Sequence, residues 1–134
     1  MGFLLDTNIV WDLIRHPRGK IFDGIKRTGE ANICTSIVVA AELRFGAARK
    51  NSRPLTAQLE TIFGAIEVLA LEAPVDATYR AISTRLEKAG QPIGANDLLI
   101  AAHALTLGHT LVTDNEPEFS KVGNLGVENW LGFG

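Results

Sequence analysis

Short apolar runs alternate with segments of helical periodicity along this chain, and this alternation constrains the fold more than any other feature. The runs expected to form strands are residues 2–5, 31–34, 67–71, 110–113 and, with a weaker pattern, 126–128. Strands that alternate with helices usually pair in parallel and are covered by helices on both faces. The sequence therefore predicts an α/β fold with a central parallel sheet.

Three helices are expected between these strands. Residues 74–89 form an amphipathic pattern that begins at Pro74, ends before Gly90 and carries an apolar stripe of Val75, Tyr79, Ile82 and Leu86. A second amphipathic helix follows Pro54, and its apolar face is Leu55, Leu59, Ile62, Phe63 and Ile66. Residues 95–107 have almost no polar face, which is typical of a buried central helix.

Composition indicates one domain spanning residues 1–134. The chain is 46% hydrophobic and 21% charged, which suits a single core. No apolar run approaches the roughly 20 residues that span a bilayer, and the N-terminus lacks a signal-peptide pattern, so we expect a cytoplasmic protein. A lone cysteine, Cys34, excludes a disulfide framework and is expected to be a buried structural thiol.

The overall charge gives no general attraction to nucleic acid. The net charge is −2 and the pI is about 5.9. Basic residues gather locally in two groups, and solvated helix faces are the favoured interpretation of both. The first group is Arg15, His16, Arg18, Lys20, Lys26 and Arg27, and the second is Arg44, Arg49, Lys50 and Arg53.

Four carboxylates fall at corresponding places relative to the expected strands. Asp6 follows the first strand, Glu42 lies on the helix after the second, Asp97 opens the buried helix, and Asp114 follows the strand TLVT. In an open parallel sheet the ends of the strands share one edge, and ligands bind there where the strand order reverses. The four acids are therefore expected to meet in space.

Clustered carboxylates raise one another's pKa unless a cation neutralises them. Mg²⁺ prefers oxygen ligands and is often held by one or two carboxylates together with waters and phosphate oxygens. Such an ion can activate a water for attack on a phosphodiester, which requires no nucleophilic side chain. The short polar residues Thr7, Asn8, Thr35, Ser36 and Thr113 also follow strands, and Ser36 is the expected N-cap of the Glu42 helix.

Each acid also has a structural interpretation. Asp6 and Asp97 are suited to capping the helices that they open. Glu42 has apolar neighbours one turn away, so it is equally well explained as one partner of a buried ion pair with Arg44 or Arg85. His103 is expected to be a hydrogen-bonded core histidine, whereas His16 and His109 are expected at the surface or in turns.

These residues, in this order, resemble the PIN-domain family and specifically its VapC-type toxin branch. The matching segments are LLDTNI, TSIVVAAELRFGA, PIGANDLLIAAHAL, TLVTDNEPEF and VGNLGVENW, which together cover most of the chain. The resemblance implies a three-layer α/β/α fold and an endoribonuclease that depends on Mg²⁺ or Mn²⁺. It implies Asp6 and Asp97 as the principal metal ligands and Glu42 as the acid that completes the pocket and positions the metal-bound water.

The resemblance leaves the fourth acid open. Many family members place it two residues after the threonine of the VT motif, where this chain has Asn115. Asp114, one residue earlier, is the favoured substitute as catalytic residue and metal ligand, and Glu116 and Glu118 are the alternatives.

The resemblance also implies partners. They are a VapB-like antitoxin that represses the toxin and carries it to operator DNA, an RNA substrate that is expected to be a tRNA, and a second copy of the chain in a homodimer. A phosphatase of the haloacid dehalogenase type is disfavoured, because its second Asp would stand at Asn8. A catalytically silent module that only binds the antitoxin and regulates transcription is the remaining alternative.

Overall fold

Five parallel strands form the central sheet of the computed structural model, which describes residues 2–132. The strands are β1 (Phe3–Leu5), β2 (Ile33–Ser36), β3 (Glu67–Leu69), β4 (Thr110–Val112) and β5 (Val127–Glu128). Their order is β3-β2-β1-β4-β5, and Leu5 pairs with Thr35 on one side and with Val112 on the other. The predicted parallel α/β fold is therefore confirmed.

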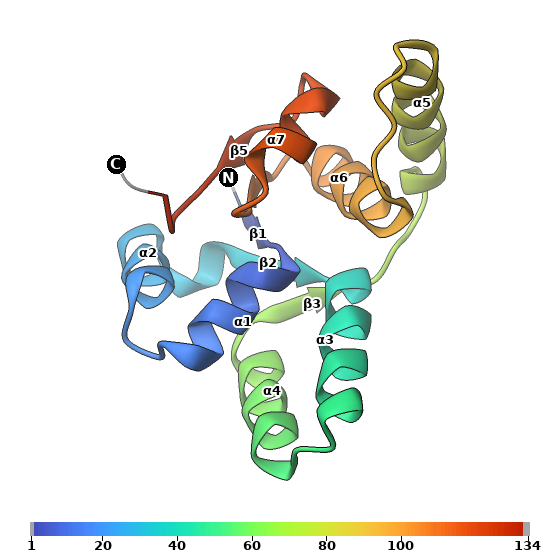
Figure 1. Ribbon diagram of the computed structural model, residues 1–134. Helices are drawn as coiled ribbons and strands as arrows, with labels where there is room; N and C mark the ends of the chain where they lie inside the picture. The colour runs from blue at the N-terminus through green and yellow to red at the C-terminus, as the bar shows by residue number, and fades with distance from the viewer. Residues whose placement is uncertain (1, 133–134) are drawn as a thin grey trace.

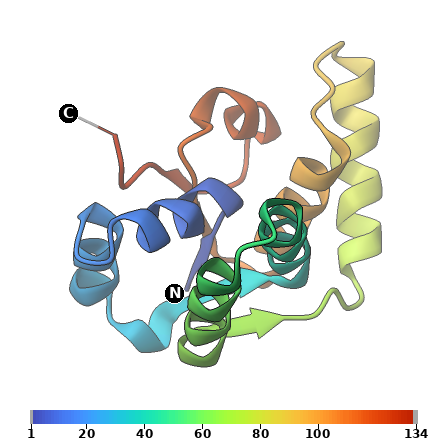
Figure 2. The same cartoon turned by 60° about the horizontal axis from the view of Figure 1, so that its bottom comes forward.

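Nine helical segments connect the strands within the described residues. Seven are α-helices, namely α1 (Thr7–Arg15), α2 (Lys20–Thr28), α3 (Ile37–Lys50), α4 (Arg53–Ala65), α5 (Val75–Lys88), α6 (Ala95–Leu107) and α7 (Glu116–Phe119). Two are short 3₁₀ turns, η1 (Glu30–Asn32) and η2 (Ser120–Val122). Figure 1 shows α1, α3 and α4 on one side of the sheet and α5, α6 and α7 on the other. Figure 2 shows β3 at an outer edge beside α4, opposite the C-terminal segment.

Strand β2 differs from its predicted bounds at both ends. Residues 31 and 32 belong to the turn η1, and the strand continues through Thr35 and Ser36. Both of these side chains are buried, and the Thr35 hydroxyl donates to the Leu5 carbonyl oxygen at 2.7 Å. Their polarity marked them as the residues after the strand, but the hydrogen bond lets Thr35 lie inside the sheet.

The predicted helices form with the expected faces. On α5, Val75, Ile82 and Leu86 are buried. The side chains of Ser36 and Ser52 cap α3 and α4 by accepting hydrogen bonds from the first helical turn. Helix α6 is buried along most of its length, as its lack of a polar face predicted, and no helix in the described part of the chain could span a membrane.

The chain reverses direction across the sheet next to β1. From β1 it adds β2 and then β3 on one side, and it then returns to place β4 and β5 on the other. The carboxyl ends of β1 and β4 therefore lie next to each other at the point where the strand order reverses, which is where open parallel sheets bind ligands. Asp6 follows β1 directly, and Thr113 and Asp114 follow β4.

Candidate active site

Asp6 is the most buried of the four predicted acids, with 6% of its surface exposed. One carboxylate oxygen accepts from the Thr7 backbone N–H at 2.8 Å and so caps α1, and the other accepts from the Thr113 hydroxyl at 2.7 Å. Burial raises the pKa of Asp6, the two hydrogen bonds oppose that rise, and the charges of Glu42 and Asp114 add to it. The capping interpretation is therefore confirmed, and the charges of two other predicted acids act on the same carboxylate.

Glu42 faces the same edge of the sheet from α3. One carboxylate oxygen accepts from the Thr7 hydroxyl at 2.5 Å, and the other accepts from the Asn96 amide at 3.2 Å. Neither partner is a cation, and the charge of Glu42 adds to the raised pKa values of Asp6 and Asp97. These two hydrogen bonds fix the direction in which Glu42 points.

The alternative of a buried ion pair for Glu42 was wrong. Arg44 points to the other side of α3 and pairs with Glu60, and both of these side chains are more than half exposed. Arg85 donates instead to the backbone oxygen of Val122. A residue two positions from Glu42 lies on a different face of the helix, so Arg44 could reach it only by turning back across α3.

Asp97 lies in the first turn of α6 and is half-buried. Its carboxylate accepts no hydrogen bond from residues 2–132, so the alternative role as a hydrogen-bonding cap is not seen. Burial raises its pKa to about 6, and the negative charges of Asp6, Glu118 and Glu42 add to that rise. The Asp97 carboxylate therefore has several anionic neighbours and no hydrogen-bond donor among residues 2–132.

The turn after β4 carries the three candidates for the fourth acid. The exposed Asp114 accepts from the Asn8 amide at 3.3 Å, and its charge acts on Asp6. Glu118 accepts from the Gly94 N–H at 3.3 Å and pairs with Lys121 at 3.2 Å, and its charge acts on Asp97.

Glu116, by contrast, is hydrogen-bonded to the residue that follows β5. It accepts from the Asn129 amide at 3.2 Å, and its charge contributes to neither the Asp6 nor the Asp97 shift. Sequence spacing alone could not separate the three acids, because they share one short turn.

The donor set suits a hard divalent cation. In residues 2–132, no three His, Cys, Asp or Glu side chains converge closely enough to form a complete metal cage. Mg²⁺ does not require one, since it commonly takes one or two carboxylates and completes its shell with waters and phosphate oxygens. The acids at this edge offer only oxygen donors, and a cation would relieve the repulsion that adds to the effect of burial on the pKa values of Asp6 and Asp97.

Sequence reasoning missed Asn96, which holds Glu42 from a helix more than 50 residues away in sequence. A signal for it existed, because Asn96 and Asp97 are neighbouring polar side chains in the first turn of a helix that is mostly apolar. The expected core histidine is confirmed, since His103 is buried and its Nδ1 lies 2.9 Å from the Ser36 hydroxyl. His109 is more buried than expected, because its ring packs against Gly2.

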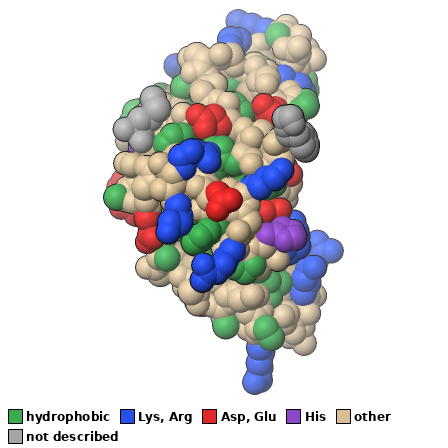
Figure 3. All heavy atoms as spheres, turned by 90° about the vertical axis from the view of Figure 1, so that its left-hand side faces the viewer, with side chains coloured by type: hydrophobic (Ala, Val, Ile, Leu, Met, Phe, Trp, Pro, Cys, Tyr) green, Lys and Arg blue, Asp and Glu red, His purple; other side chains and the backbone are tan. Residues whose placement is uncertain are grey.

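The first basic group identified in the sequence includes Arg18 and Lys26. Arg18 and Lys26 lie over the ring of Phe22, 5.7 Å from its centre, as expected of a solvated surface. Figure 3, which views the side that carries α2, shows Lys and Arg side chains interspersed with Asp and Glu. This surface has mixed charge and gives no broad attraction to an anion.

Comparison with known families agrees with this fold. Residues 3–125 match the PIN domain family. The ribonuclease VapC2 of Rickettsia felis is 36% identical over 133 residues, which cover 97% of this chain and 98% of the relative. The tRNA(fMet)-specific endonuclease VapC of Shigella flexneri is 33% identical over 132 residues, with 97% and 98% coverage.

Solved structures give the same result in three dimensions. The chain is similar to one in the crystal structure of VapBC2 from Rickettsia felis bound to a DNA fragment from their promoter, with a TM-score of 0.89, 34% identity and coverage of 97% and 99%. It is also similar to one in DNA-bound VapBC from Salmonella typhimurium, with a TM-score of 0.84, 28% identity and coverage of 97% and 98%. The parallel sheet, the acidic edge and these full-length matches together show that the chain belongs to the PIN-domain family, in its branch of VapC-type toxin ribonucleases.

Proposed function

We propose that this chain, acting as one nuclease domain, hydrolyses RNA phosphodiester bonds with Mg²⁺ or Mn²⁺. The observation that carries the proposal is the placement of Asp6, Glu42 and Asp97 at the switch point of the sheet. Asp6 and Asp97 are the principal metal ligands, because they come from two elements whose ends meet there and because burial and nearby negative charges raise the pKa of each.

Asp6 and Asp97 would hold a divalent cation, which would supply positive charge for the scissile phosphate and make a nearby water more acidic. Glu42 is fixed by Thr7 and Asn96, so its carboxylate can orient that water and accept its proton. Thr113 holds the buried Asp6 carboxylate in one orientation. No nucleophilic side chain is needed, because the attacking oxygen comes from water.

For the fourth acid we propose Asp114 as the first choice and Glu118 as the second. Asp114 acts on Asp6 from the end of β4, and Glu118 acts on Asp97 from α7. Glu116 is bonded to Asn129 and serves as the matched control in the same turn. Single alanine variants at the three positions test this order, and a loss of cleavage at Glu116 alone would reject it.

The central experiment measures cleavage of RNA by the purified chain with Mg²⁺, with Mn²⁺ and with EDTA. Asp6→Asn and Asp97→Asn are expected to abolish cleavage while the fold is retained, and Asp23→Asn, an exposed acid of α2, is expected to cleave as the wild type does. Circular dichroism checks that each variant is folded. Cleavage that persists in EDTA and in both variants would overturn the proposal.

We further propose that the RNA is a tRNA, that the chain acts in the cytoplasm as a homodimer and that a VapB-like antitoxin inhibits it and carries it to operator DNA. Support comes from a relative described as a tRNA(fMet)-specific endonuclease and from relatives crystallised as VapBC complexes with DNA. Mapping RNA ends after brief expression without the antitoxin tests the substrate. Growth arrest that disappears in Asp6→Asn would exclude a module that acts by binding alone.

A further inference from the structure

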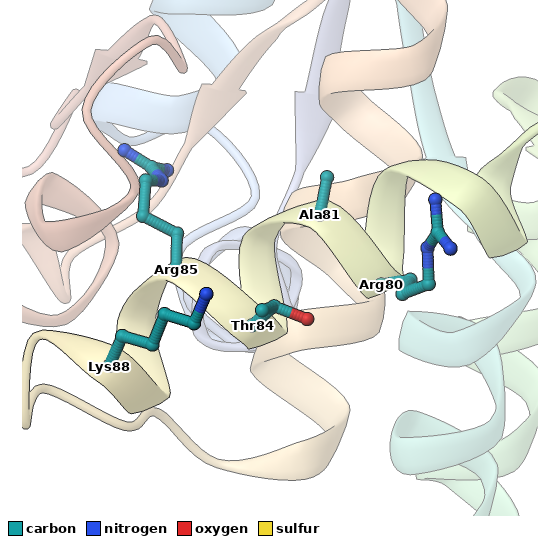
Figure 4. A pocket seen from close by; sticks show the side chains of 5 residues that line it. All are labelled: Arg80, Ala81, Thr84, Arg85 and Lys88. Carbon is teal, nitrogen blue, oxygen red and sulfur yellow. The ribbon is translucent and has the colours of Figure 1, made fainter.

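Helix α5 carries a concave basic surface on the side that faces away from its apolar stripe. Five residues line it, namely Arg80, Ala81, Thr84, Arg85 and Lys88, and we call this surface the α5 strip. Figure 4 shows Arg80 at one end and Arg85 and Lys88 at the other, with the shorter Ala81 and Thr84 between them. The small residues in the middle create the hollow that the three long cations surround.

The cations of the α5 strip are not neutralised by the protein. Among residues 2–132, the ion pairs join Arg44 to Glu60 and Lys121 to Glu118, so none involves a member of the strip. Asp76 and Glu87 are the acids of α5 that flank this face, and neither lies within ion-pair distance of the three cations. The chain has a net charge of −2, yet the lining of this hollow contains three cations and no acid.

Arg85 connects the α5 strip to the acidic edge of the sheet. Its guanidinium donates to the Val122 backbone oxygen and lies so close to Gly123 that a Cβ there would be 3.1 Å from Nη1. The same segment carries Lys121, which pairs with Glu118, and the charge of Glu118 acts on Asp97. The strip therefore borders the segment that contributes to the candidate active site.

We propose that the α5 strip binds backbone phosphates of the RNA substrate beside the scissile bond. The inference rests on the proposed ribonuclease function and adds the surface that positions the substrate. Arg, Lys and Thr side chains are typical phosphate contacts, and eight residues of helix extend about 12 Å, which is enough to face more than one phosphate of a strand. The acidic site repels RNA unless metal is bound, so binding requires cations placed beside it.

Arg80 and Lys88 are the residues to change, since the side chain of neither forms a hydrogen bond or ion pair with residues 2–132. The double variant Arg80→Gln/Lys88→Gln is measured by fluorescence anisotropy with a labelled RNA stem–loop in EDTA, where binding is separated from cleavage. Removing two phosphate contacts is expected to reduce the slope of log affinity against log salt by about 1.4 to 1.8. The same two contacts correspond to a loss of affinity of about 25- to 60-fold at about 0.1 M salt.

The matched control is Lys50→Gln/Arg53→Gln, which removes the same charge from exposed residues where α3 ends and α4 begins. It is expected to bind with the affinity and salt slope of the wild type. Wild-type binding by the α5 double variant, or an equal loss in the control, would overturn the proposal. Arg80→Glu/Lys88→Glu should weaken binding further, and thermal melting by circular dichroism confirms that all variants fold.

Cleavage of the same RNA by the wild type with Mg²⁺ is measured in parallel. Binding that depends on the α5 strip without any cleavage would reject the proposed ribonuclease function and leave this surface intact as an RNA site. Cleavage without dependence of binding on the strip would reject the surface alone.

Discussion

Replacing Asp97 with asparagine is expected to stabilise the metal-free protein while it abolishes cleavage. The pKa of Asp97 is raised from its ordinary value near 3.8 to about 6 by burial and by the charges of Asp6, Glu118 and Glu42. Between pH 4 and pH 6 the folded chain therefore holds a proton on Asp97 that the unfolded chain has released. The free energy of unfolding falls as pH rises through this range, and asparagine, which cannot ionise, removes that fall.

The size of the effect follows from the shift. Two pKa units correspond to about 3 kcal/mol, and because Asp97 is only half-buried, solvent screening reduces this to roughly 1 to 2 kcal/mol at pH 8. With the usual unfolding entropy of a domain of this length, the midpoint temperature should rise by about 4 to 7 °C. At pH 4 the wild-type carboxyl is protonated and the difference should be close to zero.

Urea denaturation in EDTA measures the difference in the free energy of unfolding between Asp97→Asn and the wild type at pH 4 and at pH 8. The control is Asp76→Asn, an exposed acid in the first turn of α5, which should lower stability slightly through the helix dipole. Equal stability of Asp97→Asn and wild type at pH 8, or an advantage that persists at pH 4, would refute the reasoning. Mg²⁺ should stabilise the wild type and not the variant, because a ligand that binds only the folded state raises its stability.

Other predictions follow from the same contacts. Thr113→Val removes the hydroxyl that donates to Asp6 and should lower the free energy of unfolding by about 1 to 3 kcal/mol in urea, whereas Thr56→Val, at an exposed site, should have little effect. Asn96→Ala frees Glu42 and should slow cleavage about tenfold without changing the melting midpoint, and an unchanged rate would contradict its positioning role. Cleavage should fall as pH drops below about 6, and more Mg²⁺ should move this midpoint to lower pH because cation and proton compete for Asp97.

The sequence predicted the positions of those acids that depend only on the neighbouring strand or helix. Asp6 comes directly after β1 and Asp114 comes two residues after β4, so once those strands were recognised, the parallel pairing placed both at one edge. Asp97 opens a helix whose apolar character was evident along its length. In each case the position depends on a local pattern and on one general property of parallel sheets.

Contacts between distant segments could not be predicted in the same way. Glu42 had two plausible cationic partners in sequence, yet its actual partners are the neutral Thr7 and Asn96, 35 and 54 residues away. Which side of α3 faces the sheet decides this, and the weak amphipathic pattern of that helix does not determine the side. Which of Asp114, Glu116 and Glu118 acts on Asp6 or Asp97 likewise depends on the conformation of one short turn.

The register of β1 limits how the chain can change in length. Leu5 is paired on both sides, with Thr35 and Val112, and Asp6 donates its N–H to the Val112 carbonyl oxygen. An insertion of one residue within β1 would send the carboxylate to the opposite face of the sheet. The exposed turn at residues 90–92 lies outside the sheet, so extra residues there would leave the paired strands undisturbed. Tolerance of this protein to insertions should therefore be decided by distance from β1 more than by distance along the chain from the acids.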